Sequence, residues 1–559
     1  MATTHPLHLI LELDVGHIRR RLFEIIPGFL SWGTMVGLGV LAFVIPFWIA
    51  IFVIIYDVYV LIRAVYMSIH LIYAYRHLRH LAGIDWLARC RGVSGDAPHY
   101  YEQVQRELTG LQSQRGKAAR TRRWQLTQHL QELEYIRATR RQILPWSKVH
   151  HLIVLPTYNE PLEVLRSSLT ALRNAAFPLQ RVHVVVGFEE RVGPQAKQKA
   201  ATLEREFGSR FGTFLTTMHP DGLPGERRVK SANATWAIQQ LEEVLAQKLI
   251  PIEHIIVSNF DSDTAVSREY FAQLTYVFIT HPDRYRVSYQ PLPMYNNNVW
   301  DAPAFSRVIA TGSTFWQMIE STRPERLVTF SSHSMTLKAL KDVGYWQKDI
   351  ISEDSRIFWQ CLLHYDGNYR TQPLYTTLSM DAALAGTWWQ TFKNQYKQKR
   401  RWAWGIENFP HMAEGFWRNA RIPRRIKWQY TFRTLEGHYS WTTTAIIVAG
   451  LGWLPVLFGD PVFQTTVLSY SLPSIARTIM TVAMVGLLVS TMLTLQLLPP
   501  KPATHSSWRY VSMTLQWVLV PLIATALSAI PALDAETRLL LGRDLEFNVM
   551  QKIRKTTQH

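Results

Sequence analysis

Four long stretches of this chain contain no charged side chain, and they limit what it can fold into more than any other feature. They are residues 25–56, 437–459, 478–500 and 510–533. A helix needs about 20 apolar residues to cross the hydrocarbon core of a bilayer, and each stretch is long enough. The first continues in apolar character to about Tyr75, so we expect a helical hairpin that turns near Pro46. A cleavable signal peptide would have a shorter apolar segment. The sequence therefore predicts an integral membrane protein.

The net charge of +18 raises the question of a nucleic-acid partner. Much of the excess lies beside the apolar stretches, at residues 19–21, 76–91, 115–141 and 418–425. Lys and Arg in such places normally mark the cytoplasmic side of a membrane and its anionic lipid surface. We therefore expect the lipid bilayer as a partner, and no nucleic acid. Two cysteines and histidines without ligand-like clustering predict neither a disulfide framework nor a zinc site.

Between the first two apolar stretches, two polar regions differ in their pattern. Residues 100–143 are rich in helix formers and predict one or two exposed helices that break at Gly110 and Gly116. From Val149 onward short strands alternate with helices, which indicates a parallel α/β sheet. Strands are expected at 151–155, 182–187 and 254–259, and helices at 161–175, 194–206, 230–246 and 267–280.

These patterns divide the chain into seven regions. They are a basic cytoplasmic lead-in (1–28), a transmembrane hairpin (29–75), a cytoplasmic helical connector (76–148), an α/β domain (149–405), interfacial amphipathic helices (406–436), a C-terminal transmembrane region (437–533) and a basic tail (534–559). Counting positive charges puts the α/β domain and the tail in the cytoplasm. Three full crossings after the α/β domain would leave the tail outside. Because Pro521 and Pro531 interrupt a helical hydrogen-bond ladder, we expect residues 510–533 to enter and return, or to lie along the interface, without crossing.

Four short signatures follow one another between residues 189 and 402. They are Glu189-Glu190, Asp261-Ser262-Asp263, Ser352-Glu353-Asp354 and Gln398-Lys399-Arg400-Arg401-Trp402. The first two follow apolar runs that are typical of buried strands, and open α/β sheets bind their ligands at the carboxyl ends of such strands. Acidic groups there, a later Asp and a basic-aromatic run suit one task. That task is to hold a metal-bound diphosphate while an incoming hydroxyl loses its proton.

In these signatures the chain resembles the membrane-embedded family 2 glycosyltransferases of the cellulose synthase and hyaluronan synthase kind. The resemblance implies a GT-A, Rossmann-like domain for a nucleotide-sugar, inserted between N- and C-terminal transmembrane helices. It implies inverting transfer of a sugar, with UDP as the expected carrier, to a hydroxyl acceptor, so that a polysaccharide is built or extended. The alternatives are transfer of one sugar to a lipid-linked acceptor and a non-catalytic membrane scaffold or transporter. The sequence does not identify the sugar, the acceptor or an export partner.

On the donor side, the resemblance implies roles for several residues. Thr157, Tyr158 and Glu160 follow the first strand and match the loop that packs the base and ribose. Glu189 or Glu190 stands where the family usually has an Asp, and the longer side chain of a Glu changes the geometry of that contact. Two residues at the start of a helix match the family's Lys-x-x-Asn, whose Lys reaches phosphate oxygens: Lys230 and Asn233. The free amides and dipole of a helix start independently favour phosphate.

Asp261 and Asp263 form the most specific signature. Two carboxylates that project the same way from one extended segment can chelate a hard cation, and Mg2+ typically uses one or two carboxylates plus substrate phosphates. We therefore expect Mg2+ or Mn2+ as cofactor. By the resemblance, Asp261 approaches the nucleotide-sugar, Asp263 ligates the metal directly and Asp354 is the catalytic base.

The remaining candidates lie on the acceptor and diphosphate side. By the resemblance, Glu353 accompanies the base, Arg401 braces the diphosphate, and Gln398 and Trp402 frame the acceptor sugar. Ser352 is expected to cap the helix that follows it. Residues 290–300 are expected to form a long polar-aromatic loop, which either faces the acceptor or is an ordinary surface loop.

Overall fold

A computed structural model describes the backbone of residues 6–545 and the side chains of residues 16–545. The expected basic residues of the tail, Lys552, Arg554 and Lys555, lie outside the described residues. The chain forms two compact units. One, here called the sheet unit, consists of Ile72–Asn297 and Thr314–Asp381, and the other, the helical unit, consists of Met1–Leu71, Asn298–Ser313 and Ala382–His559. Each unit is described by itself.

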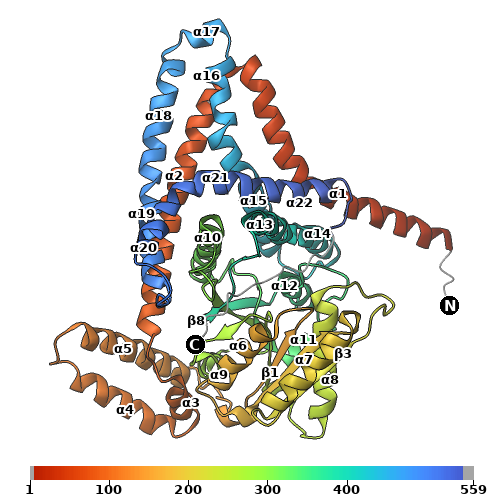
Figure 1. The fold of residues 1–559 in the computed structure, drawn as a ribbon, viewed down its shortest axis with the longest axis vertical. Helices are drawn as coiled ribbons and strands as arrows, with labels where there is room; N and C mark the ends of the chain where they lie inside the picture. The colour runs from red at the N-terminus through yellow and green to blue at the C-terminus, as the bar shows by residue number, and fades with distance from the viewer. Residues whose placement is uncertain (1–5, 546–559) are drawn as a thin grey trace. The chain divides into compact units, whose positions relative to one another are not determined.

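The sheet unit is built on a mixed sheet of eight strands in the order β3-β2-β1-β4-β7-β6-β8-β5 (Figure 1). The strands are β1 (His150–Pro156), β2 (Val182–Glu189), β3 (Thr213–His219), β4 (Ile255–Asn259), β5 (Ala265–Val266), β6 (Val287–Met294), β7 (Ser334–Thr336) and β8 (Arg370–Ser379). β1 pairs in parallel with β2 and β4, and β2 pairs in parallel with β3. All residues of β2 and β4 are buried, which explains why they read as continuous apolar runs.

The helices of the sheet unit connect these strands. They are α6 (Leu162–Arg173), α7 (Pro194–Phe207), α8 (Lys230–Ala246), α9 (Tyr270–Thr280), α11 (Leu337–Asp342) and α12 (Glu353–His364). α8 packs against β1, β2 and β3. The three strands and four helices expected from the sequence are confirmed within a few residues, and so is the α/β class of the fold. The sequence did not predict the other strands, β3 and β5–β8.

The expected loop at 290–300 is wrong for its first five residues. Gln290–Met294 belong to β6, which is buried along its whole length. β6 pairs in parallel with β8 with an irregularity between Gln290 and Leu292, and its pairing with β7 involves only Ser288 and Tyr289. Pro291 therefore falls at the irregularity, where a proline costs no regular ladder bond.

The connector between the hairpin and the sheet folds as three helices. They are α3 (Trp86–Ser94), α4 (Ala97–Gly110) and α5 (Lys117–Ala138), so the expected breaks at Gly110 and Gly116 are confirmed. α3 packs against α9, and Val104, Leu126 and Leu133 are buried in the same hydrophobic cluster as the sheet. The helices are thus part of the sheet unit and expose only one side to solvent.

The helical unit contains the apolar stretches. Its elements are α1 (Pro6–Val44), α2 (Pro46–Leu81, up to Leu71), the first half of α10 (Ala304–Ser321), α13 (Trp388–Ala403), α14 (Asn408–Arg418), α15 (Arg424–Ala449), α16 (Leu454–Phe458), α17 (Pro461–Gln464), α18 (Val467–Ala483), α19 (Val485–Leu497), α20 (Trp508–Leu515), α21 (Val520–Ala524), a π-helical turn (Thr525–Ala529) and α22 (Ile530–Leu540). The break between α1 and α2 at Ile45 lies next to the expected turn at Pro46, and the transmembrane hairpin itself stays a prediction. By length and composition, four described helices can cross a membrane: Gly16–Val44, Pro46–Leu81, Val467–Leu497 and Trp508–Leu540. α15 and α16 make a fifth candidate that is bent by 44°.

Residues 510–533 were expected either to enter the membrane and return or to lie along its interface. The first of these expectations is wrong, because the segment does not fold back on itself. Helical turns run through it as one candidate span of 33 residues, Trp508–Leu540. Pro521 follows the 3-10 turn Gln516–Leu519 and Pro531 follows the π-helical turn, so both prolines stand where the type of helix changes and its hydrogen bonds are irregular. Whether this helix crosses the membrane or lies along its surface stays a prediction.

A group of buried histidines at the amino ends of β1 and β2 makes the sheet unit sensitive to acid. His150 Nδ1 lies 3.0 Å from His183 Nε2. Burial lowers the pKa of His150 to about 4 and the pKa values of His151 and His183 to about 3. In the unfolded chain these groups titrate near 6.5. Their neutral forms therefore support the fold fully above pH 6.5, and that support is lost as the pH falls toward 4.

We expect the melting temperature of the sheet unit to fall between pH 6.5 and pH 4, and the variant His183→Gln to show a shallower fall. The exposed His99 supplies the control, because His99→Gln should leave the slope unchanged. Thermal unfolding followed by intrinsic fluorescence measures both. An identical slope in His183→Gln and the wild type would contradict the role of the buried imidazoles.

Candidate active site

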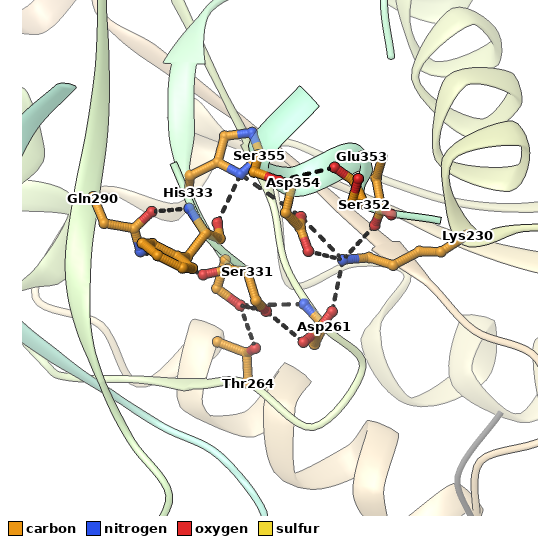
Figure 2. A network of polar contacts seen from close by, with 12 residues as sticks. Lys230, Asp261, Thr264, Gln290, Ser331, His333, Ser352, Glu353, Asp354 and Ser355 are labelled. Atoms are coloured by element: carbon orange, nitrogen blue, oxygen red, sulfur yellow. Dashed lines mark hydrogen bonds and ion pairs between the residues drawn. The ribbon is translucent and has the colours of Figure 1, made fainter. Parts of the chain in front are cut away.

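Four of the predicted residues come together, three of them as carboxylates around the ammonium group of the fourth. Lys230, the first residue of α8, places its Nζ 2.6 Å from Asp261, 3.2 Å from Glu353 and 3.3 Å from Asp354 (Figure 2). The carboxylates come from the turn after β4 and from the first turn of α12. Segments more than a hundred residues apart thus meet at the ends of the central strands, where open α/β sheets bind their ligands.

Burial gives this cluster its electrostatic character. The side chain of Lys230 is 16% exposed and that of Glu353 is 4% exposed. Burial alone would lower the pKa of Lys230, but the charges of Asp261, Asp354 and Glu353 outweigh it and hold that pKa well above its ordinary value. Burial raises the pKa of Glu353 to about 8, and the charge of Asp354 adds to this while Lys230 opposes it. The raised pKa of Glu353 means that its negative charge is not fully compensated here, so a further cation would stabilise the cluster.

The two acids of the Asp-x-Asp signature have different surroundings. The carboxylate of Asp261 faces Lys230 and accepts a hydrogen bond from the hydroxyl of Ser331. Asp263 is fully buried, and its Oδ2 accepts a bond of 2.9 Å from the backbone N–H of Asp381. Asn297 donates in turn to the carboxylate of Asp381 at 2.9 Å. Asp263 is thus fixed to the chain that follows β8, whereas Asp261 points at the ion cluster.

A loop before β7 contributes a histidine that the sequence did not single out. His333 is fully buried, with Nδ1 3.0 Å from the carbonyl oxygen of Phe330 and 3.8 Å from Oδ1 of Asp354. Burial lowers its pKa, so the ring is neutral at pH 7. Gln290 of β6 holds this loop, because its Oε1 accepts a bond of 2.7 Å from the N–H of Phe330. A lone histidine carries no sequence signal for such a position.

The loop after β1 is organised by Glu160 and by Asn233 of α8. Glu160 accepts bonds of 2.7 Å from the hydroxyl of Thr157 and 2.8 Å from the N–H of Tyr158. The Nδ2 of Asn233 donates to the carbonyl oxygens of Thr157 at 3.2 Å and Gly187 at 2.8 Å. A Cβ at Gly187 would stand 2.3 Å from Oδ1 of Asn233, so only glycine permits this contact. Asn233 thereby ties together the carboxyl ends of β1 and β2.

Glu189, the last residue of β2, borders a cavity. Arg191 forms an ion pair with Glu189, and its guanidinium lies 4.4 Å from the centre of the Tyr158 ring. Burial raises the pKa of Glu189, although Arg191 opposes the shift. The cavity has a volume of about 100 Å³, and its walls include Glu189, Arg191, His219, Asp221, Arg227 and Arg228. The walls also include Glu226, so three arginines and three acids line the cavity, and Arg228 pairs with Asp221 as Arg191 does with Glu189. Such a lining suits a polar ligand.

The basic-aromatic signature lies on α13 in the helical unit. Thr387 caps this helix by accepting a bond from the N–H of Gln390. Gln398 is buried and accepts a bond of 3.0 Å from Gln395. The structure thus places Gln398, Arg401 and Trp402 on one helix, and their expected roles toward acceptor and diphosphate stay predictions.

The sequence expected Ser352 to cap α12 with its side chain, and that detail is wrong. Ser352 is the residue before the helix, but its side chain makes no capping bond. Its carbonyl oxygen accepts instead from the N–H of Arg356 at 2.9 Å. The position of the cap was predicted correctly, and Glu353 and Asp354 occupy the first turn, where acidic side chains are favoured.

Three carboxylates on one cation form an oxygen-rich donor set of the kind that Mg2+ prefers. Among residues 16–545, no group of three or more His, Cys, Asp and Glu side chains is arranged to hold a metal by itself. Mg2+ usually takes only one or two protein carboxylates and completes its shell with substrate phosphates and water. The residues present therefore fit a divalent cation that arrives with a diphosphate.

Comparison with protein families agrees with this chemistry. Residues 256–529 match the family described as Glycosyl transferase family group 2. The chain thus contains a family 2 glycosyltransferase domain. The expected enzyme class is confirmed, and the scaffold and transporter alternatives are set aside. The GT-A type of fold stays a prediction. A comparison with curated proteins finds no match.

Solved structures of other glycosyltransferases are also similar to this enzyme. The mannosyltransferase PcManGT from Pyrobaculum calidifontis, in complex with GDP-Man and Mn2+, is 16% identical and has a TM-score of 0.36, with 79% of this chain and 100% of that chain covered. TarS 1–349 from S. aureus, in complex with UDP-GlcNAc, is 12% identical and has a TM-score of 0.33, with 72% of this chain and 95% of that chain covered.

We expect the variant Lys230→Met to destabilise the glycosyltransferase by about 3 kcal/mol or more, because it leaves buried carboxylates without their cation. Millimolar Mg2+ or Mn2+ should recover a large part of the lost melting temperature, since a divalent cation can replace the ammonium. Lys341→Met is the matched control. It removes an ion pair of 2.7 Å whose lysine is 42% exposed, and such pairs contribute little. A Lys230→Met protein that melts like the wild type would contradict the electrostatic account.

Proposed function

We propose that the protein transfers a sugar from a nucleotide-sugar to a hydroxyl acceptor with inversion at the anomeric carbon. The observation that carries the proposal is the convergence of Asp261, Glu353 and Asp354 on Lys230. A cation in that position suits a diphosphate leaving group, and a carboxylate 3.3 Å away suits the proton of an attacking hydroxyl.

Asp354 is the proposed general base. Its side chain is 23% exposed, more than that of Glu353, so it is open to an incoming acceptor. The hydroxyl oxygen attacks the anomeric carbon, its proton passes to the Asp354 carboxylate, and the bond to the diphosphate oxygen breaks with its electron pair leaving on the diphosphate. One in-line displacement of this kind inverts the anomeric centre. Neutral His333 beside Asp354 adds no competing positive charge.

Lys230 acts on the departing diphosphate in this proposal. Negative charge grows on the leaving oxygen, and a positioned ammonium in a site with little water stabilises that charge strongly. When Lys230 turns toward the diphosphate, its hold on Asp354 weakens and the carboxylate becomes a better base. Mg2+ or Mn2+, held by Asp261 and Asp263 as the sequence predicts, would neutralise further charge on the diphosphate.

The loop after β1 and the end of β2 form the proposed donor site. Thr157, Tyr158 and Glu160 are held in one hydrogen-bonded turn that Asn233 attaches to β2. Glu189 stands at the cavity beside them. We assign the nucleoside to this region, because an aromatic ring, a buried carboxylate and several cations match a base, a ribose and phosphates.

The proposed acceptor and product follow from α13 and the apolar helices. Gln398 and Trp402 would frame an acceptor sugar, because the C–H face of a sugar packs on an indole ring, and Arg401 would brace the diphosphate. We propose a domain on the cytoplasmic side of the membrane whose product is a growing polysaccharide. Transfer of one sugar to a lipid-linked acceptor is the second candidate.

Asp354→Asn should retain donor binding and lose transfer, because the amide matches the carboxylate in size but cannot accept the proton. Loss of a general base typically lowers the rate by a factor of about 100 to 10,000. Calorimetry with the donor and a product assay with purified protein separate the two effects. The exposed Asp349 provides the control variant Asp349→Asn. A normal transfer rate in Asp354→Asn would remove this residue from the base role.

A panel of nucleotide-sugars, each with Mg2+ or Mn2+ and with EDTA, should identify one donor whose turnover needs the metal. Asp263→Ala should abolish that turnover while the protein stays folded and inserted in the membrane. Calorimetric unfolding checks the fold, because Asp263 also bonds to the backbone of Asp381. Turnover at the wild-type rate in a folded Asp263→Ala protein would show that this residue holds no metal.

A further inference from the structure

Lys399 of α13 is a half-buried cation with no anion. Its Nζ lies 4.9 Å from the ring centre of Trp402 and 5.5 Å from that of Trp441. Within the part of the chain that the structure describes, these two indole rings are its only electrostatic partners, and it makes no hydrogen bond or ion pair there. Loss of water around the ammonium lowers the pKa of Lys399 to about 8.

Neighbouring cations on α13 differ from Lys399. Arg400, the next residue, pairs with Asp534 of α22 at 2.8 Å. Lys393 and Lys397 point outward and are exposed to solvent. A charge that leaves water needs a partner, and cation–π contacts return only part of the lost hydration energy. Arg400 is thus compensated by an acid, and Lys393 and Lys397 are compensated by water. Lys399 has neither kind of compensation within the described residues.

The side chains around Lys399 are held in fixed orientations by hydrogen bonds and packing. The Nε1 of Trp441 donates a bond of 2.8 Å to Ser528 of the π-helical turn, which fixes the orientation of that indole. Trp402 packs on a hydrophobic cluster that includes Phe305 and Leu527. One turn before Trp441, the buried Nδ1 of His438 has no hydrogen-bond partner among the described residues. Two fixed rings thus flank a cation, and a second unsatisfied nitrogen lies nearby.

We propose that Lys399, Trp402, Trp441 and His438 form a binding site for the phosphate group of an amphiphilic lipid. A phosphate supplies the missing negative charge and accepts hydrogen bonds from the ammonium and the imidazole. The adjoining indole faces pack on apolar or sugar atoms next to it. Trp402 is shared with the proposed acceptor site, whereas nothing in the proposed transfer reaction assigns Lys399, Trp441 or His438 a role.

The location of Trp441 favours a lipid over a free anion. Residues 437–459 contain no charged side chain, and α15 with α16 is apolar enough to span a membrane. Indole rings gather at the level of lipid headgroups, and Lys side chains reach that level from apolar surroundings. Lipid phosphate can come from two sources, the bulk phospholipid or a lipid phosphate that carries a sugar, and both share the chemistry of this site.

Native mass spectrometry of the full-length protein in dodecyl maltoside micelles tests the proposal. The probes are farnesyl phosphate, its neutral counterpart farnesol, and dioleoylphosphatidylglycerol. We expect one farnesyl phosphate to bind at least tenfold more tightly than farnesol. Lys399→Met should weaken that binding about tenfold, as for loss of a charged hydrogen bond. Lys399→Arg should retain it, and Lys397→Met, on the exposed side of the same helix, should not change it.

Competition distinguishes the two sources. If an equal concentration of phosphatidylglycerol displaces farnesyl phosphate, the site takes bulk phospholipid, and if it does not, the site selects a prenyl-type phosphate. Equal binding of farnesol and farnesyl phosphate, or undiminished binding by Lys399→Met, would overturn the proposal.

A second measurement covers the case in which Lys399→Met fails to fold. A farnesyl phosphate analogue with a diazirine group should label the wild-type protein within residues 393–404 or 434–446. Labels confined to other segments would also overturn the proposal.

Discussion

Three carboxylates would not stay together in a buried place without the ammonium of Lys230. Asp261, Glu353 and Asp354 arise from two connections of the sheet, and Lys230 opens the helix that packs on β1, β2 and β3. The arrangement of strands and helices at this edge of the sheet therefore depends on one cation. The ion pairs of this site also depend on one another, because any anion that binds Lys230 weakens the ion pair between Lys230 and Asp354. In the proposed reaction a diphosphate is such a group, and its binding to Lys230 would loosen the contact of Lys230 with Asp354.

The parts of the fold that the sequence predicted are those whose signals are local. β1, β2 and β4 read as apolar runs because both of their faces are covered, and α8 carries its own start and periodicity. β6 was missed because Gln290, Pro291 and Pro293 resemble a loop, and its burial depends on pairing with β8, which follows some eighty residues later. Local propensity yields here to a long-range partner, as is common for strands.

The candidate site shows the same division. Asp261, Asp263, Asp354 and Lys230 were found because short spacings mark them in the sequence. His333 was not found, because its importance lies in its 3.8 Å distance from Asp354, and no spacing along the chain encodes that distance. The raised pKa of Glu353 could not be predicted either, since it depends on complete burial next to a second acid. Sequence identifies the groups that do chemistry, while their charge states follow from packing.

The helical unit extends this reasoning to apolar surroundings, where every polar group needs a partner. Ser31 donates to Glu536 at 2.6 Å and Arg63 pairs with Glu436 at 2.8 Å, so helices that read as uniformly apolar are joined by specific polar contacts. Composition located the helices but not these contacts. On α13, Arg400 forms an ion pair with Asp534 of α22. Lys399, the residue before it, contacts only aromatic rings among the described residues. A negative charge from outside the chain is the partner that we propose for Lys399.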